Sequence, residues 1–158
     1  MLVEKLGSMT QFTKVPHAAL FLTFIDGAQI YGMKIRTKAG LDAVLHLASD
    51  EPKVVEEIHF VNKDVFVLES PTFQFADLSQ ARSGNLEAKA RGVAILSTEG
   101  TFIRASHSQG PFDVDLGRGV ARGSRNHPDS MWFDSWDVVV TRANEREVLF
   151  GHHVATKR

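Results

Sequence analysis

The stretch Ala18–Ile35, AALFLTFIDGAQIYGMKI, decides the fold. Its first part, Ala18–Ile25, is an apolar and aromatic run with the length of a strand that is buried on both faces. Asp26-Gly27 follows, and this pair is a strong hairpin signal because glycine tolerates a positive φ. Ala28–Ile35 then supplies the returning strand, with Gly32 placed where a bulge or sharp bend would need it. The stretch predicts a β-hairpin.

Further short apolar segments predict that the rest of the first half is also β-sheet. Leu41–Leu47 largely alternates apolar with polar residues, and Ser49–Pro52 breaks it. Ile58–Leu68 is expected to hold two strand pieces around the polar turn Val61–Asp64, with a strongly β-prone end at Val65–Leu68. A short helix is one interpretation of the N-terminal segment. We expect about five short strands in the first half.

The second half shows short strands at roughly ten-residue spacing, which is typical of a β-barrel or sandwich. Pro71–Leu86 is the best linker candidate, although an alternative keeps Thr72–Phe75 as a strand. Gly117–Pro128 is the loosest segment, and Ala143–Arg146 is expected to be a hairpin turn. The predicted strands are Leu86–Arg91, Val93–Leu96, Thr101–Ser106, Phe112–Leu116, Trp132–Arg142 and Glu147–Ala155.

These patterns predict a mainly β protein with two units. The first is a small barrel-like N-terminal half over residues 10–72, and the second is a further β-rich unit over residues 85–158. One continuous β-barrel and an α+β domain are the alternatives. Small open barrels have edge strands that invite pairing between subunits, so we also expect a homo-oligomer.

Composition limits the class of protein. The chain has 158 residues, of which 43% are hydrophobic and 23% charged, so a packed core is expected and disorder of the whole chain is excluded. The formal net charge is −1, and a nucleic-acid partner would therefore need a local basic patch. The absence of cysteine removes disulfides and thiolate chemistry. With no apolar run long enough for a bilayer, we expect a cytoplasmic protein without membrane contact.

Three arginines, Arg118, Arg122 and Arg125, lie in the glycine-containing segment before Pro128. Guanidinium groups form bidentate hydrogen bonds with phosphate, so the segment is a candidate anion clamp, with Arg104 and His107 as neighbours. The alternative is a solvated surface loop.

Both tryptophans of the chain, Trp132 and Trp136, flank Asp134. On a single strand these three side chains would share one face. Such a face is typical of a ligand pocket or partner interface, while core packing with Asp134 at the rim is the alternative.

The sequence contains no recognisable catalytic motif, and we assign no catalytic residue and no cofactor. The glycines in Gly117–Gly123 have the wrong spacing for a dinucleotide-binding turn, and Ser106-His107-Ser108 is not a nucleophile elbow. An enzyme in which Asp134 meets His107 or His127 only in the fold stays open as an alternative.

We expect no metal site either. The adjacent pair His152-His153 would point to opposite faces of a strand. Zinc needs three or four convergent donors, which only the distant His46, His59 and His107 could supply.

The segments from Ala18 to Leu68 resemble the Sm-like fold, the small five-stranded barrel of Sm, LSm and Hfq proteins. Gly32 follows five residues after Gly27, and Leu41–Leu45, LDAVL, falls where that family carries Met-Asn-Leu-Val-Leu. Val61–Leu68, VNKDVFVL, resembles the second signature of the family. The resemblance covers about a third of the chain and implies a ring of subunits that binds uridine-rich RNA.

The RNA-contacting positions depart from the family pattern. Gly40 stands where an aromatic or histidine ring would stack on a base, Asp42 replaces the customary asparagine, and Asn62-Lys63 replaces Arg-Gly. Stacking contributes about 1–3 kcal/mol per base, so the barrel could be present without the RNA chemistry.

Two classes of function follow, with an enzyme as the third. The first is a non-enzymatic Sm-like scaffold or RNA-binding oligomer, in which Lys38, Lys63 and the three arginines contact phosphate and Tyr31 is a candidate stacking ring. Its partner would be single-stranded RNA. The second is a protein that binds a small anionic ligand in a barrel mouth lined by the tryptophans and arginines.

Overall fold

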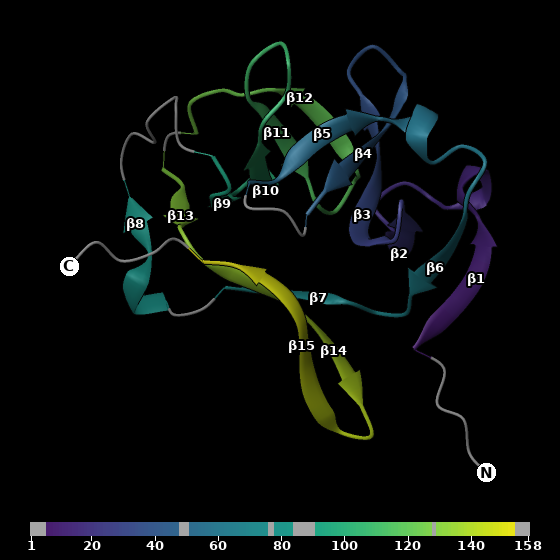
Figure 1. The fold of residues 1–158 in the computed structure, drawn as a ribbon. Coiled ribbons are helices and arrows are strands. Elements are labelled where there is room, and N and C mark those ends of the chain that lie inside the picture. Colours follow the sequence, from purple (N-terminus) through teal and green to yellow (C-terminus); the bar gives the residue numbers. More distant parts are fainter. Residues whose placement is uncertain (1–5, 48–50, 76–77, 84–90, 128, 154–158) are drawn as a thin grey trace.

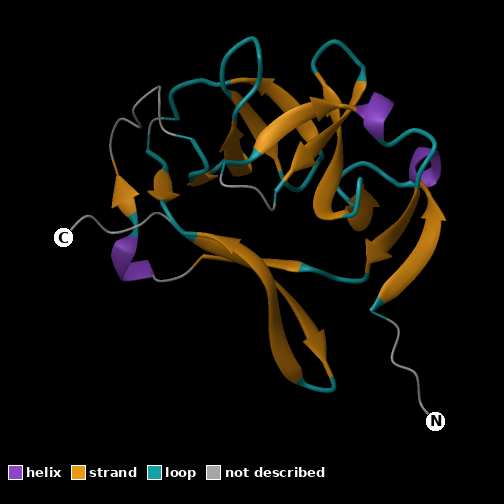
Figure 2. Ribbon diagram, viewed as in Figure 1, coloured by secondary structure: helices purple, strands orange, loops and turns teal. Residues whose placement is uncertain are grey.

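The computed structural model describes residues 6–47, 51–75, 78–83, 91–127 and 129–153. These residues form fifteen strands and three short 3-10 helices, without an α-helix among them. Twelve strands belong to one mixed sheet and three to a second, smaller sheet (Figures 1 and 2). The prediction of a mainly β protein is confirmed. In the same ranges no helix is long and apolar enough to cross a membrane.

The first six strands come from the N-terminal half. They are β1 (Gly7–Gln11), β2 (Leu20–Ile25), β3 (Ala28–Thr37), β4 (Asp42–His46), β5 (Lys53–Glu56) and β6 (Asp64–Leu68). The 3-10 helix η1 (Phe12–Lys14) follows β1, and η2 (Glu57–His59) precedes β6.

The rest of the chain supplies nine strands and one more 3-10 helix. They are β7 (Thr72–Phe75), η3 (Leu78–Gln80), β8 (Arg82–Ser83), β9 (Ala94–Ser97), β10 (Gly100–Ala105), β11 (Phe112–Asp115), β12 (Val120–Gly123), β13 (Met131–Phe133), β14 (Trp136–Arg142) and β15 (Glu145–His152). Strands β15, β14 and β7 make the small sheet.

The hairpin predicted at Asp26-Gly27 is present. Both residues have a positive φ, 50° and 78°, and β2 pairs with β3 without interruption through the whole hairpin. The expectation of a bulge at Gly32 is wrong, because the register there is continuous. A Cβ at this position would lie 2.8 Å from Phe21 Cζ and from Val44 Cγ1. Glycine is needed at position 32 because the two side chains pack directly on its backbone.

The N-terminal strands curve around an aromatic cluster. Strand β6 pairs back with β2, so the sheet runs in the order β6-β2-β3-β4-β5. Phe12, Phe21 and Phe60 pack against one another inside it in edge-on or tilted contacts, with ring centroids 5.6–5.8 Å apart. Among the described residues β5 does not pair with β6, and the sheet is therefore barrel-like but does not close into a ring.

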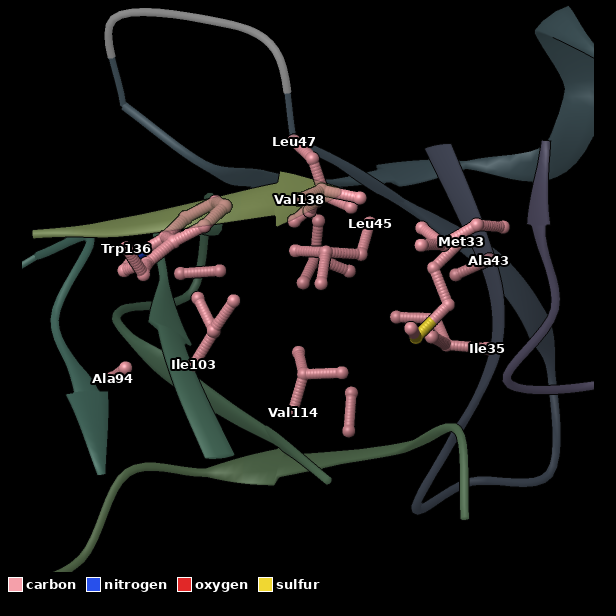
Figure 3. Close-up of a cluster of buried hydrophobic side chains, with 14 of the residues drawn as sticks. Met33, Ile35, Ala43, Leu45, Leu47, Ala94, Ile103, Val114, Trp136 and Val138 are labelled. Atoms are coloured by element: carbon pink, nitrogen blue, oxygen red, sulfur yellow. The ribbon is translucent and has the colours of Figure 1, made fainter. Parts of the chain in front are cut away.

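Strand β3 joins the two predicted units. Its ten residues extend beyond β2, and Arg36 and Thr37 pair in parallel with Val120 and Ala121 of β12. The main core lies on the outer face of the N-terminal sheet and takes buried residues from both units, among them Met33, Ile35, Leu45, Ile103, Val114 and Trp136 (Figure 3). The boundary predicted between the units is thus crossed by a strand pairing and by the main core.

Several local predictions for the first half are corrected. The N-terminal segment forms β1 rather than a helix, Ile58 lies in η2 rather than in a strand, and β5 was missed. Thr72–Phe75 is strand β7, which confirms the alternative that shortened the linker. The predicted strand Leu86–Arg91 falls largely outside the described residues.

In the second half, the strands β9, β10 and β11 confirm three predictions, and Ala143-Asn144 forms the expected turn with φ of 47° and 66°. The segment Gly117–Pro128 is not only a loop, because Val120–Gly123 forms β12 between β11 and β3. The single strand predicted over Trp132–Arg142 is divided into β13 and β14, which belong to different sheets.

Replacing Gly32 with alanine tests the close approach at the aromatic cluster. We expect Gly32→Ala to lower the free energy of unfolding by about 1–3 kcal/mol, because the added methyl group overpacks Phe21 and Val44. Gly123→Ala, in strand β12 with open space at the Cβ position, is the matched control. Urea unfolding measures both. Equal stabilities of the two variants would contradict the role of Gly32.

Candidate functional site

A cleft of about 460 Å³ lies where the two predicted units meet. Four segments line it: the turn between β3 and β4, strand β5, the turn between β10 and β11, and the end of β12. Its size is in the usual range for small-molecule sites. Three of the residues predicted to bind a ligand, Lys38, Asp42 and Arg122, line this cleft together.

The cleft has apolar walls and a polar rim. Ala43, Val54, Phe112 and Ala121 contribute apolar surface. The ring of His107 stacks on Phe112 with centroids 4.3 Å apart, and its Nδ1 accepts a hydrogen bond from the amide of Gln109. This contact fixes the ring at the rim, so the cleft can offer an aromatic surface to a ligand.

Asp42 is held by two residues that do not line the cleft. His17 Nε2 lies 2.7 Å from Asp42 Oδ1, and the ammonium of Lys34 lies 4.0 Å from Oδ2. Lys34 is 4% exposed, and it donates to the carbonyls of Phe12 and Thr13 at η1. The negative charge of Asp42 at the cleft is therefore opposed by the charge of a buried lysine.

The three arginines of the predicted clamp do not converge on one point. Arg118 pairs with Asp115 at 3.5 Å, and Arg125 forms an exposed pair with Glu99. Arg122 lies over the ring of Phe102, 5.9 Å from its centroid. The Nε of Arg122 is buried and has no hydrogen-bond partner in the described residues. Of these three arginines, Arg122 therefore keeps a buried donor without an acceptor in the described residues, on the sheet face that carries Phe102.

A buried charged network holds the segment that follows Arg122. Arg104 and Asp113 are 2% and 1% exposed and form two hydrogen bonds, of 2.8 and 3.2 Å. His127 Nε2 lies 2.8 Å from the same carboxylate, and the amide of Arg125 donates to it at 3.2 Å. Arg104 also donates to the carbonyl of Arg125. The network anchors the segment after β12 onto the sheet face formed by β10 and β11.

The two tryptophans lie in different clusters. Trp136 is fully buried in the main core and donates from its Nε1 to the carbonyl of Gly92. Trp132 packs on a smaller cluster with Phe102, below the guanidinium of Arg82. Because the chain changes sheet between β13 and β14, the two rings lie in different sheets and in different clusters of the described residues.

Tyr31 and Lys63 lie away from the cleft. The ring of Tyr31 packs against Phe150 in a tilted contact with centroids 4.6 Å apart, and burial together with the charge of Glu147 raises the pKa of its hydroxyl. Lys63 lines a separate hollow of about 310 Å³ beside Gln11 and Thr13. The structure therefore separates the candidate stacking ring from the candidate phosphate contacts.

The residues of the enzyme alternative have other partners. Asp134 pairs with Arg82 at 3.0 Å, His127 with Asp113, and His107 with the ring of Phe112. Within the part of the chain that the structure describes, no three histidine or carboxylate side chains converge as metal ligands would.

Comparisons with known proteins do not add to this picture. No protein-family model, no curated protein and no solved structure matches the chain. The site is therefore argued from its own geometry.

Sequence reasoning found three cleft residues and named His107 as a neighbour of the arginine segment, but it missed Asp113 as the centre of a network. The only signal for Asp113 is its alternation with Asp115 in FDVD, which places two carboxylates on one face of a strand. Their partners lie on other strands or in the segment after β12, so the sequence does not identify them.

We expect Asp113→Ala to lower the free energy of unfolding by about 3–5 kcal/mol, because it leaves the Arg104 guanidinium buried without a counterion. Glu99→Ala removes the exposed partner of Arg125 and should change stability by less than about 1 kcal/mol. Urea unfolding measures both variants. A small effect of Asp113→Ala would show that the network contributes little.

Two partly buried histidines predict a loss of stability in mild acid. Burial lowers the pKa of His46 and of His152, and the charges of Lys53 and His153 add to this effect. The unfolded chain therefore binds protons at these sites more readily than the folded chain. The free energy of unfolding should fall as the pH drops through about 6.5, the ordinary histidine pKa.

The measurement is urea unfolding between about pH 7.5 and 5.5. His152→Gln should flatten the pH dependence, whereas His59→Gln, at an exposed position, should leave it unchanged. If both variants keep the slope of the original chain, His152 is not one of its causes.

Proposed function

We propose that the protein is a non-enzymatic binding protein that holds a small anionic ligand in the cleft between the two sheet regions. The observation that carries this proposal is the cleft lining, which brings the cation Lys38 to the same hollow as the stacked rings of His107 and Phe112. A hydrogen bond to a charged group contributes about 1.5–3 kcal/mol, and an aromatic surface beside it favours a ligand with a flat or apolar body. A ligand carboxylate or phosphate would supply the acceptor for the Lys38 ammonium.

The cleft residues favour one acidic group on an apolar or flat body. Lys38 supplies a cation from the β3–β4 turn, while Phe112 and His107 offer an aromatic surface. Asp42 and Glu56 also line the cleft, and their carboxylates disfavour a polyanion. The lining therefore suits a small ligand with a single acidic group better than a nucleic-acid strand.

RNA binding of the Sm-like kind stays a prediction, and the contacts of Tyr31 and Asp42 do not favour it. The ring of Tyr31 is covered on one side by Phe150, and Asp42 already has His17 as a partner. Neither Lys63 nor Tyr31 lies in the cleft with Lys38. We therefore place the ligand-binding function first.

The probe for the first test is 8-anilinonaphthalene-1-sulfonate, an aromatic anion whose emission rises in apolar surroundings. We expect saturable binding that Lys38→Met weakens roughly tenfold or more, because a charge-assisted hydrogen bond contributes about 1.5–3 kcal/mol. The same variant should be about as stable as the original chain, since Lys38 is exposed. Fluorescence titration and urea unfolding measure the two effects.

Charge reversal of one lysine inside the cleft and of one outside it tests where the probe binds. Lys38→Glu should weaken the probe, and Lys14→Glu, an exposed lysine outside the cleft, should not. Labelled oligo-uridine serves as the competing partner. Salt-dependent binding of oligo-uridine that Lys63→Glu abolishes, together with a probe indifferent to Lys38→Met, would replace our proposal with the RNA function.

A further inference from the structure

Strand β1 presents an unprotected sheet edge. It stands at one end of the twelve-stranded sheet and pairs only with β6 among the described residues. Its sequence, GSMTQ, contains no charge and no proline, and its register with β6 has no bulge. Natural proteins usually protect free edges with such features, because an open row of backbone donors and acceptors pairs with other chains.

The outer strand of the small sheet, β15, shows the protection that β1 lacks. It begins with Glu145, Arg146 and Glu147, and its pairing with β14 is interrupted by a bulge beside Val138. The opposite end of the large sheet is β8, which has only two residues. Of these three edges, β1 is the one that has no charged residue, no bulge and more than two residues.

An apolar row reaches the free edge of β1. Met9 pairs with Phe66 of β6, Phe66 with Leu22 of β2, and Leu22 with Tyr31 of β3, so the four side chains lie on one sheet face. The inner end of the row packs against the main core, where Tyr31 and Phe66 are partly buried. Its outer end is open, with Met9 66% exposed. The row stops at a large apolar side chain instead of a polar one.

We propose that two copies of the chain pair through antiparallel β1 strands, with Met9 opposite Met9 of the partner subunit. A two-fold axis perpendicular to the sheet keeps equivalent side chains on the same face, so the apolar row continues from one subunit into the other. Ser8 then faces Thr10 of the partner subunit, and no like charges oppose each other because the strand has none.

A second copy fits this edge better than an unrelated partner does. A two-fold contact places a surface against itself, and an uncharged strand with Met9 at its centre is complementary to itself. Five paired residues on each side make a smaller contact than a standard interface of roughly 800 Å² per partner. The dimer therefore forms in a concentration-dependent equilibrium.

The chain has no cysteine, so a single introduced cysteine gives an unambiguous crosslink. We expect Met9→Cys to form a disulfide-linked dimer with oxidised glutathione, because opposite residues of antiparallel strands have Cβ atoms about 4.5–5.5 Å apart. Met131→Cys, an exposed methionine on β13, is the matched control. Faster crosslinking of Met9→Cys supports the β1 contact. Absent or equal crosslinking overturns it.

Analytical ultracentrifugation between about 1 µM and 1 mM protein tests the same contact without a covalent crosslink. Met9→Lys should raise the dimer dissociation constant about tenfold or more, since it places like charges opposite each other. Circular dichroism checks that this exposed substitution leaves the fold intact. Val148→Lys, on the exposed part of β15, should have no effect. A monomer throughout, or a dimer that only Val148→Lys disrupts, overturns the proposal.

Discussion

The parallel pairing of β3 with β12 is the constraint on which the rest of the structure depends. β3 supplies the returning strand of the first hairpin, and its last residues carry the sheet into the second unit. Gly119 beside β12 has a positive φ of 67°, and a Cβ there would lie 2.4 Å from the backbone nitrogen of Ala18. The junction therefore needs the backbone of one unit to lie directly on that of the other, and the cleft lies at this junction.

Buried charged side chains hold connecting segments in place on both sides of this junction. Lys34 holds η1 from within the N-terminal sheet, and the Arg104–Asp113 pair holds the segment after β12. Such pairs contribute little net stability compared with apolar packing, but they are strongly destabilising when one partner is removed. Each of them ties a connecting segment to a strand. They therefore help to specify where the connections around the cleft lie.

Local turn chemistry could be predicted from the sequence, and strand identity only in part. The turns at Asp26-Gly27 and Ala143-Asn144 contain Gly27 and Asn144, which tolerate a positive φ. Strands β1, β5 and β12 were missed because their short, weakly apolar sequences form strands only where a partner edge is present. Trp132 and Trp136 were expected on one face for a related reason, since the sequence does not show where a chain leaves one sheet for another.

The three arginines show why the sequence predicts only part of the candidate site. The sequence shows three guanidinium groups in one segment, but whether each is free for a ligand depends on which carboxylates the fold places beside it. Glu99 reaches Arg125 from the β9–β10 turn, and Asp115 pairs with Arg118 three residues further along the same turn. Arg122 faces the ring of Phe102 instead, which cannot accept from Nε as a carboxylate can. The fold thus pairs two of the guanidinium groups with carboxylates and leaves the Nε of the third without an acceptor in the described residues.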